Sequence, residues 1–236
     1  MDDRLADRVG AASGIAFVVL DLIGAFMYPE QPRSDSPPGV TLAWVHDHRV
    51  ALQWGMILSL LAAAALVWFV GYLRVRVRPV EGGGPDPGPM VLAGGVAVAV
   101  MLALAVMPTA ILAFMDSQPA GLRDMALVRM FGDLNTVFFS AVSAMTVVFL
   151  AALALPMLRR VLLARWVGWL AALVAAVNVV AVWVEVTFSS YHGKAWNAVG
   201  WGANIGLIAV VLVCSVMTLA GGSRRLAAAP TPSIAV

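Results

Sequence analysis

Charge is what this sequence has least of. Charged residues make up 12% of its 236 residues, about half of the roughly 25% that soluble domains carry. Lysine occurs once, as Lys194, and the single cysteine, Cys214, excludes an intrachain disulfide. The remainder is 61% hydrophobic, with a mean hydropathy of +0.91. Such a composition predicts a membrane protein.

Motifs for several common activities are also missing. The chain contains no pattern typical of a Ser/His/Asp triad, a phosphate-binding loop, a haem-ligand pair or a dinucleotide site, so no cofactor is expected. His46 and His48 are two residues apart, whereas metal-binding pairs on a helix are spaced by three or four, and no metal site is predicted. The net charge of +2 comes from arginines beside apolar segments, which argues against a nucleic acid partner.

Uncharged segments recur in blocks of about 20 residues, the length at which a helix crosses a bilayer. We therefore predict an all-α fold, a polytopic transmembrane bundle of six helices within residues 1–220, with the lipid bilayer as its partner. Residues 41–48 are expected to form a separate short helix at the membrane interface, and residues 221–236 a disordered cytoplasmic tail. The expected spans are 11–28, 50–73, 90–115, 130–155, 166–188 and 196–219.

The arginines indicate an orientation. The N-terminal segment, the second and fourth loops and the tail together hold ten of the 15 basic residues. Because basic residues are enriched on the cytoplasmic side, both termini are predicted to be cytoplasmic. The preference for arginine, alanine and valine suggests a bacterial protein, so we expect a multi-pass protein of the bacterial inner membrane. We find no internal repeat of two or three helices.

Polar residues within the spans gather near the outer ends. Asp21 is expected about 10 Å below the outer surface, Asp133 begins the fourth span, and the stretch 183–204 carries Glu185. The cytoplasmic halves contain almost nothing polar on this reading, which predicts a shared cavity open to the outside. The candidate catalytic residues are Asp21, Glu185 and Asp133, and the candidate ligand-binding residues are Trp201, Asn204, Asn197, Asn178, Asn135, Trp183 and His46.

Most of these residues also have a structural interpretation. Arg129 and Asp133 have the spacing of an ion pair on one helix, tryptophans commonly form a belt at the membrane surface, and asparagines join helices. Asp21 and Glu185 are harder to explain in this way, because an acid inside a bilayer costs on the order of 2–3 kcal/mol. Each could be a functional acid, or a protonated group that is hydrogen-bonded to an asparagine.

The fourth span contains GDLNTVFF at residues 132–139, and LLARWVGWLAAL at residues 162–173 leads into the fifth. Both stretches resemble a family of small actinobacterial membrane proteins classed as a domain of unknown function. Ala164 stands where proteins of that family have a proline before Arg-Trp. The resemblance implies a six-helix fold and no activity.

Three functions are compatible with these patterns. The first is an outward-facing site that binds or processes a small lipophilic molecule, where a buried carboxylic acid could supply acid–base chemistry such as isoprenoid cyclisation or isomerisation. The second is a non-catalytic accessory or partner subunit. A proton-coupled transporter is less favoured, because the inner halves are apolar and no repeat is found. The sequence leaves open whether the protein is an enzyme and names no protein partner.

Overall fold

Six α-helices make up nearly all of the chain that can be described. The computed structural model describes residues 3–27, 32, 36–77, 86–117, 124–159, 163–187 and 194–227, without the side chains of 3, 4, 186, 194–198 and 221–227. Within these residues there is no strand, which confirms the predicted all-α, six-helix fold. The helices are α1 (Asp3–Met27), α2 (Pro38–Arg76), α3 (Gly88–Asp116), α4 (Met125–Leu158), α5 (Arg165–Thr187) and α6 (Lys194–Ala227).

Local sequence signals explain where several helices begin. Prolines stand at the starts of α2 and α3, where the absent N–H would have no partner within the helix. At the start of α4, the side chain of Asp124 accepts hydrogen bonds from the backbone N–H groups of Ala126 (2.9 Å) and Leu127 (3.4 Å). Such a cap satisfies donors that the first helical turn leaves free.

Helices α1, α2, α4 and α6 extend beyond the expected spans, and α2 and α6 do so into segments for which a different structure was predicted. The short interfacial helix predicted at residues 41–48 is not separate, because α2 continues from Pro38 to Arg76 without a proline after its first turn. At 1.5 Å per residue its length is about 58 Å, well beyond the roughly 30 Å of a bilayer core. The structure also extends α6 to Ala227, into the segment predicted to be disordered, and residues 228–236 lie outside the described residues.

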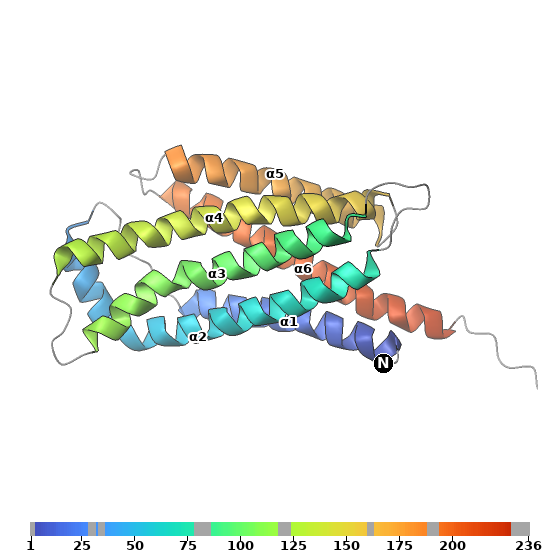
Figure 1. Cartoon of the computed structure of the whole chain (residues 1–236), viewed down its shortest axis with the longest axis horizontal. Helices are drawn as coiled ribbons and strands as arrows, with labels where there is room; N and C mark the ends of the chain where they lie inside the picture. Colours follow the sequence, from blue (N-terminus) through green and yellow to red (C-terminus); the bar gives the residue numbers. More distant parts are fainter. Residues whose placement is uncertain are drawn as a thin grey trace, which may run out of the picture.

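The helices run alternately up and down, so the start of α1 and the end of α6 lie at the same end of the bundle (Figure 1). We call this the termini end and the opposite end the distal end. Each helix packs against its neighbour in the sequence, and α6 closes the bundle by contacting both α5 and α1. The packing of α6 against these two helices is less extensive than that between the other neighbours.

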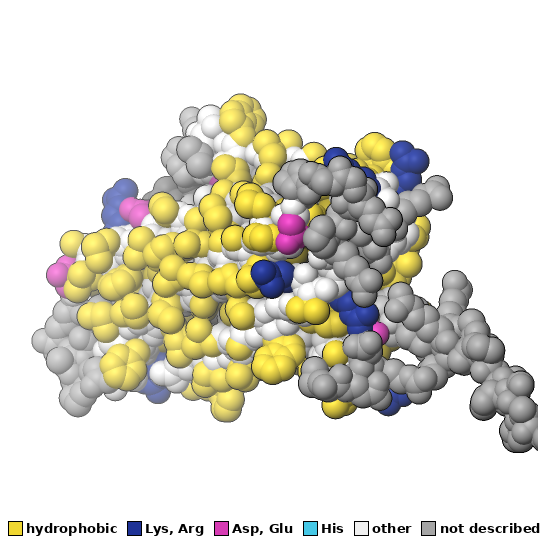
Figure 2. Space-filling model, turned by 45° about the vertical axis from the view of Figure 1, so that its right-hand side comes forward, with side chains coloured by type: hydrophobic (Ala, Val, Ile, Leu, Met, Phe, Trp, Pro, Cys, Tyr) yellow, Lys and Arg dark blue, Asp and Glu magenta, His cyan; other side chains and the backbone are white. Residues whose placement is uncertain are grey.

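The interior is apolar, and so is much of the outer surface. Phe17, Phe69 and Phe149 are fully buried, whereas large apolar side chains such as Trp68 remain exposed. Figure 2 shows hydrophobic side chains covering most of one face. All six helices are long and apolar enough to cross a membrane. Hydrocarbon is therefore the natural surrounding of this surface.

Candidate functional site

Asp21 and Asn204 connect the first helix to the last. Asp21 lies on α1 and is 8% exposed, and the side-chain nitrogen of Asn204 on α6 donates a hydrogen bond to its Oδ2 atom at 3.2 Å. Both residues were predicted site residues, 183 positions apart in the chain. The contact lies in the distal half of the bundle.

Glu185 lies in the last turns of α5 and is directed between α4 and α6. Its side chain is 6% exposed, and the Ser143 hydroxyl on α4 donates to its Oε1 atom at 3.5 Å. Ser140, one turn earlier on α4, also interacts with this carboxyl group. A Cβ atom placed on Gly200 of α6 would lie 3.4 Å from the same Oε1 atom. This is an ordinary van der Waals distance, so the carboxyl group lies directly beside α6 at Gly200.

The two buried acids consequently border one turn of the same helix. Gly200 and Asn204 are four residues apart on α6, so they occupy nearly the same face. Glu185 on α5 lies beside Gly200, and Asp21 on α1 lies beside Asn204. The acids are far apart in the sequence, and it is α6 that brings them together. We call Asp21, Ser143, Glu185, Gly200 and Asn204 the distal polar cluster.

Two oxygen atoms of this cluster are buried without a hydrogen-bond partner among the described residues: Glu185 Oε2 and Asn204 Oδ1. Burying a polar atom without such a bond costs about 1–3 kcal/mol. Buried groups in folded proteins are nearly always satisfied, so these two atoms require an explanation. Both are acceptors. One belongs to Asn204 on α6 and the other to Glu185, which lies beside the same turn of α6.

Asn135 and Asn178 are buried as well, but each has a local partner. The side-chain nitrogen of Asn135 on α4 donates to the carbonyl oxygen of Ala105 on α3 at 2.7 Å. Pro108, inside α3, leaves a carbonyl unpaired one residue earlier, at Leu104. Asn135 thus supports α3 where proline weakens its hydrogen bonding. Asn178 donates to the carbonyl of Val174 within its own helix, at 2.8 Å.

Several predicted site residues lie away from the cluster. Asp133 is exposed, and the described contacts connect it neither to Arg129 nor to the two buried acids. Trp183 and Trp201 are 61% and 47% exposed, as expected for side chains that meet lipid rather than line a buried site. The side chain of Asn197 lies outside the described residues.

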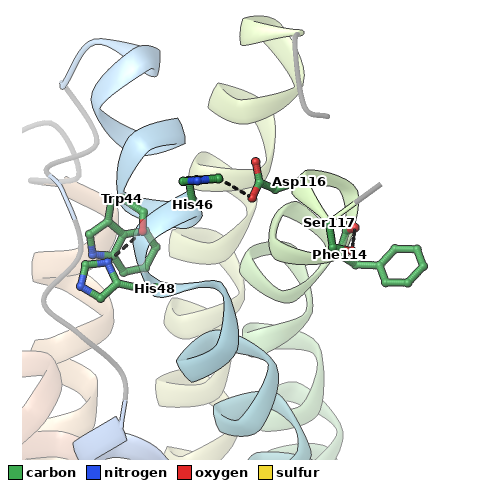
Figure 3. Close-up of polar contacts among 6 residues, drawn as sticks. All are labelled: Trp44, His46, His48, Phe114, Asp116 and Ser117. Carbon is green, nitrogen blue, oxygen red and sulfur yellow. Dashed lines mark hydrogen bonds and ion pairs between the residues drawn. The ribbon is translucent and has the colours of Figure 1, made fainter. Parts of the chain in front are cut away.

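His46 belongs to a different contact at the distal end (Figure 3). Its Nδ1 atom lies 3.1 Å from Oδ2 of Asp116 on α3, and its side chain is 70% exposed. His48 turns the other way, with Nδ1 2.8 Å from the carbonyl oxygen of Trp44. The two histidines do not converge on one point, and the described residues contain no group of ligands suited to a metal ion.

Two hollows on the surface of the described residues lie away from the acids, and neither is lined by Asp21 or Glu185. One, of about 410 Å³, is lined by residues that include Met27, His46 and Trp54. The other, of about 460 Å³, lies between α1 and α2 and is lined mainly by alanines and Trp68. The acids themselves are packed between helices. A ligand would therefore reach them only if α6 and a neighbouring helix separated.

A second polar cluster, missed by the sequence analysis, lies at the termini end. The Tyr72 hydroxyl on α2 donates to Oδ1 of Asp7 on α1 at 2.7 Å. Arg76 on α2 pairs with the same carboxylate, and Thr218 on α6 contacts Tyr72. Asp7 and Arg76 lie just outside the expected spans 11–28 and 50–73, where the sequence analysis did not look for polar contacts. Asp7 precedes the predicted span, and a single tyrosine near a helix end gives no periodic signal that could have revealed the contact.

These features define an integral, multi-pass α-helical membrane protein with a buried acidic cluster in its distal half. Comparisons with models of protein families, with curated proteins and with solved structures find no match. The resemblance to the actinobacterial family therefore remains a prediction. The function has to be argued from the cluster itself.

Proposed function

We propose that the distal polar cluster is the binding site for a small lipophilic molecule that enters from the membrane. The observation that carries this proposal is the pair of buried acceptors, Glu185 Oε2 and Asn204 Oδ1, for which the described residues provide no donor. A bound molecule with a polar group would satisfy them. Its apolar part would lie among the lipid-facing side chains of α1, α5 and α6.

The packing of α6 supports an entry route from the side. α6 contacts α1 and α5 less extensively than the other neighbouring helices contact each other, and both acids border it. Separation at α6 would therefore open the cluster at the smallest loss of packing. With both termini on the cytoplasmic side of a bacterial inner membrane, as the arginines predict, the site would face the outer leaflet.

Acid–base chemistry is a further part of this proposal. A buried carboxylic acid with a proton can donate it to a bound molecule where water is scarce. Glu185 is better suited to this role than Asp21, because one of its two oxygens is not engaged and Asp21 accepts the bond from Asn204. Isoprenoid cyclisation or isomerisation is one chemistry that such a group would serve. Asp133, which is exposed, has no part in it.

The competing function is an accessory or partner subunit in which the polar residues only hold helices together. The bonds Asn204–Asp21 and Asn135–Ala105 favour it, because each connects two helices. Interhelical hydrogen bonds in membranes stabilise by about 0.6 kcal/mol on average and up to about 2. The unpartnered Glu185 oxygen is what this alternative leaves unexplained.

One experiment with Asp21→Asn, Glu185→Gln and, as a control, Asp133→Asn separates the two functions. Each variant removes one carboxylate with little change in shape, and Asp133 is exposed. Small molecules that copurify with each protein are extracted and identified by mass spectrometry, and the melting temperature is measured in the same preparation. A binding site predicts a molecule that is lost from the first two variants and kept by the control, with melting temperatures nearly unchanged.

The opposite pattern would support the accessory subunit. In that case the melting temperatures of Asp21→Asn and Glu185→Gln would fall by several degrees. The molecules extracted from these two variants would be the same as those extracted from Asp133→Asn. Asp21→Asn is informative because an asparagine oxygen can still accept the bond from Asn204. A large loss of stability in that variant would mean that the charge itself holds α1 to α6.

A further inference from the structure

Once Glu185 is ionised, the distal polar cluster offers acceptors but no free donors. The side-chain nitrogen of Asn204 already donates to Asp21, and the Ser143 hydroxyl already donates to Glu185. The Ser140 hydroxyl donates to the carbonyl of Thr136 on its own helix at 3.2 Å. What remains for a ligand is Glu185 Oε2 and Asn204 Oδ1, both of which accept. A ligand must therefore bring hydrogen-bond donors.

The cluster also contains two acids without a basic partner. No lysine, arginine or histidine lies within residues 11–28, 50–73, 90–115, 130–155, 166–188 or 196–219, the six expected spans. The basic side chains among the described residues belong to the ends of the bundle, as Arg76 does in its pair with Asp7. A buried carboxylate without a counter-ion is strongly disfavoured. Positive charge at this site would have to come from the ligand.

We propose that the group recognised by the distal polar cluster is the protonated amine of a lipophilic molecule. An ammonium group has three N–H donors and one positive charge, and it has no acceptor. An amine that enters uncharged would take the proton of the Glu185 carboxylic acid. The resulting ammonium group can donate to Glu185 Oε2 and Asn204 Oδ1, the two unpartnered atoms, while its charge offsets that of the Glu185 carboxylate. Hydrogen bonds between ions are about twice as strong as those between neutral groups. This inference rests on the proposed binding function and specifies its ligand class.

Other chemical classes fit the same atoms less well. A carboxylate or phosphate would place its negative charge beside two acids and would meet no donor. An alcohol has one donor and no charge, so it can satisfy only one of the two acceptors. A quaternary ammonium has the charge but no N–H group. These differences allow alkyl compounds of one chain length to distinguish charge, hydrogen bonding and hydrophobic contact.

The test measures binding of radiolabelled decylamine to the full-length protein in detergent, by a scintillation proximity assay at pH 7. Unlabelled decylamine, decanol, decyltrimethylammonium and sodium chloride serve as competitors. We expect decanol and decyltrimethylammonium to compete at least about tenfold more weakly than decylamine, since each lacks part of the charge-assisted bonding. Sodium chloride at matched ionic strength should displace little of the label.

Two variants assign the binding to the cluster. Glu185→Gln should weaken decylamine binding about tenfold or more, because it removes the charge that pairs with the amine. Asp133→Asn, which removes an exposed carboxylate on α4, should change it by no more than about twofold. Equal losses in both variants would overturn the inference, because the amine would then be held by general surface charge. Melting curves confirm that each variant is folded.

The remaining outcomes separate this inference from the proposed function. If decanol competes as well as decylamine and both are weakened by Glu185→Gln, the site binds lipophilic molecules but does not select amines. If sodium ions displaced decylamine at equal concentration, the site would bind inorganic cations, and the inference that its ligand is an amine would likewise be wrong. If no alkyl compound binds to the wild-type protein, both the amine and the proposed binding function are wrong.

Discussion

Gly94 and Gly95, adjacent in α3, allow this helix to approach two neighbours closely. A Cβ atom on Gly94 would lie 2.8 Å from the Cα and 2.9 Å from the backbone nitrogen of Phe149 on α4. A Cβ atom on Gly95 would lie 2.5 Å from a Cγ atom of Val70 on α2. Carbon atoms in contact are normally about 3.5–4.0 Å apart. We therefore predict that Gly94→Ala destabilises the protein.

The change in the free energy of unfolding caused by Gly94→Ala follows from two opposing effects. Alanine favours a helix over glycine by about 0.5–1 kcal/mol. Overpacking in a close-packed interior costs about 1–3 kcal/mol, and at Gly94 the obstacle is backbone, so α3 and α4 must move apart by roughly 1 Å to restore ordinary contact. Overpacking is the larger effect, and we expect a net loss of about 1–2 kcal/mol. Gly95→Ala should also lose stability, because its obstacle is the buried, β-branched side chain of Val70, which has little freedom to move aside.

Gly71→Ala on α2 is the matched control. It lies at a similar distance from the termini end, and a Cβ atom there would have no neighbour within 4 Å. Only the gain in helix propensity then applies, so this variant should be as stable as the wild type or slightly more stable. The free energy of unfolding is measured by titrating mixed micelles with sodium dodecyl sulfate while following tryptophan fluorescence. If Gly94→Ala proved as stable as Gly71→Ala, the close approach of α3 and α4 would be refuted.

Two further predictions concern polar contacts between helices. Tyr72→Phe and Asp7→Asn should each lower the free energy of unfolding by about 1 kcal/mol, and the double variant should lose less than the sum, since both substitutions disturb one bond at the termini end; strictly additive losses in the same titration would contradict that bond. Asn135→Leu should lose about 1 kcal/mol because it removes the bond to Ala105 beside Pro108. Asp133→Asn, two residues earlier on the exposed side of α4, should be neutral, and equal losses in the two variants would refute this role of Asn135.

The candidate site could be predicted only in part. Asp21, Glu185 and Asn204 were found because polar residues inside apolar spans are rare and conspicuous. Asp133 was grouped with them by depth alone, yet it is exposed on α4. The two tryptophans stand at similar depth but face outward. Position along a span predicts depth, whereas the direction of a side chain depends on which neighbours cover each face of its helix.

The sequence by itself determined the class of protein and the number of helices, and it placed the acids inside apolar segments. All three follow from the cost of placing charge and unpaired backbone in hydrocarbon, which acts on each segment locally. Only the tertiary structure decided which polar groups meet: α6 brings Glu185 and Asp21 to one turn, and Asp7 reaches Tyr72 across 65 residues. Those contacts depend on how helices rotate and pack around one another. Small residues such as Gly94 and Gly95 set that packing, because they allow helices to approach closely in space.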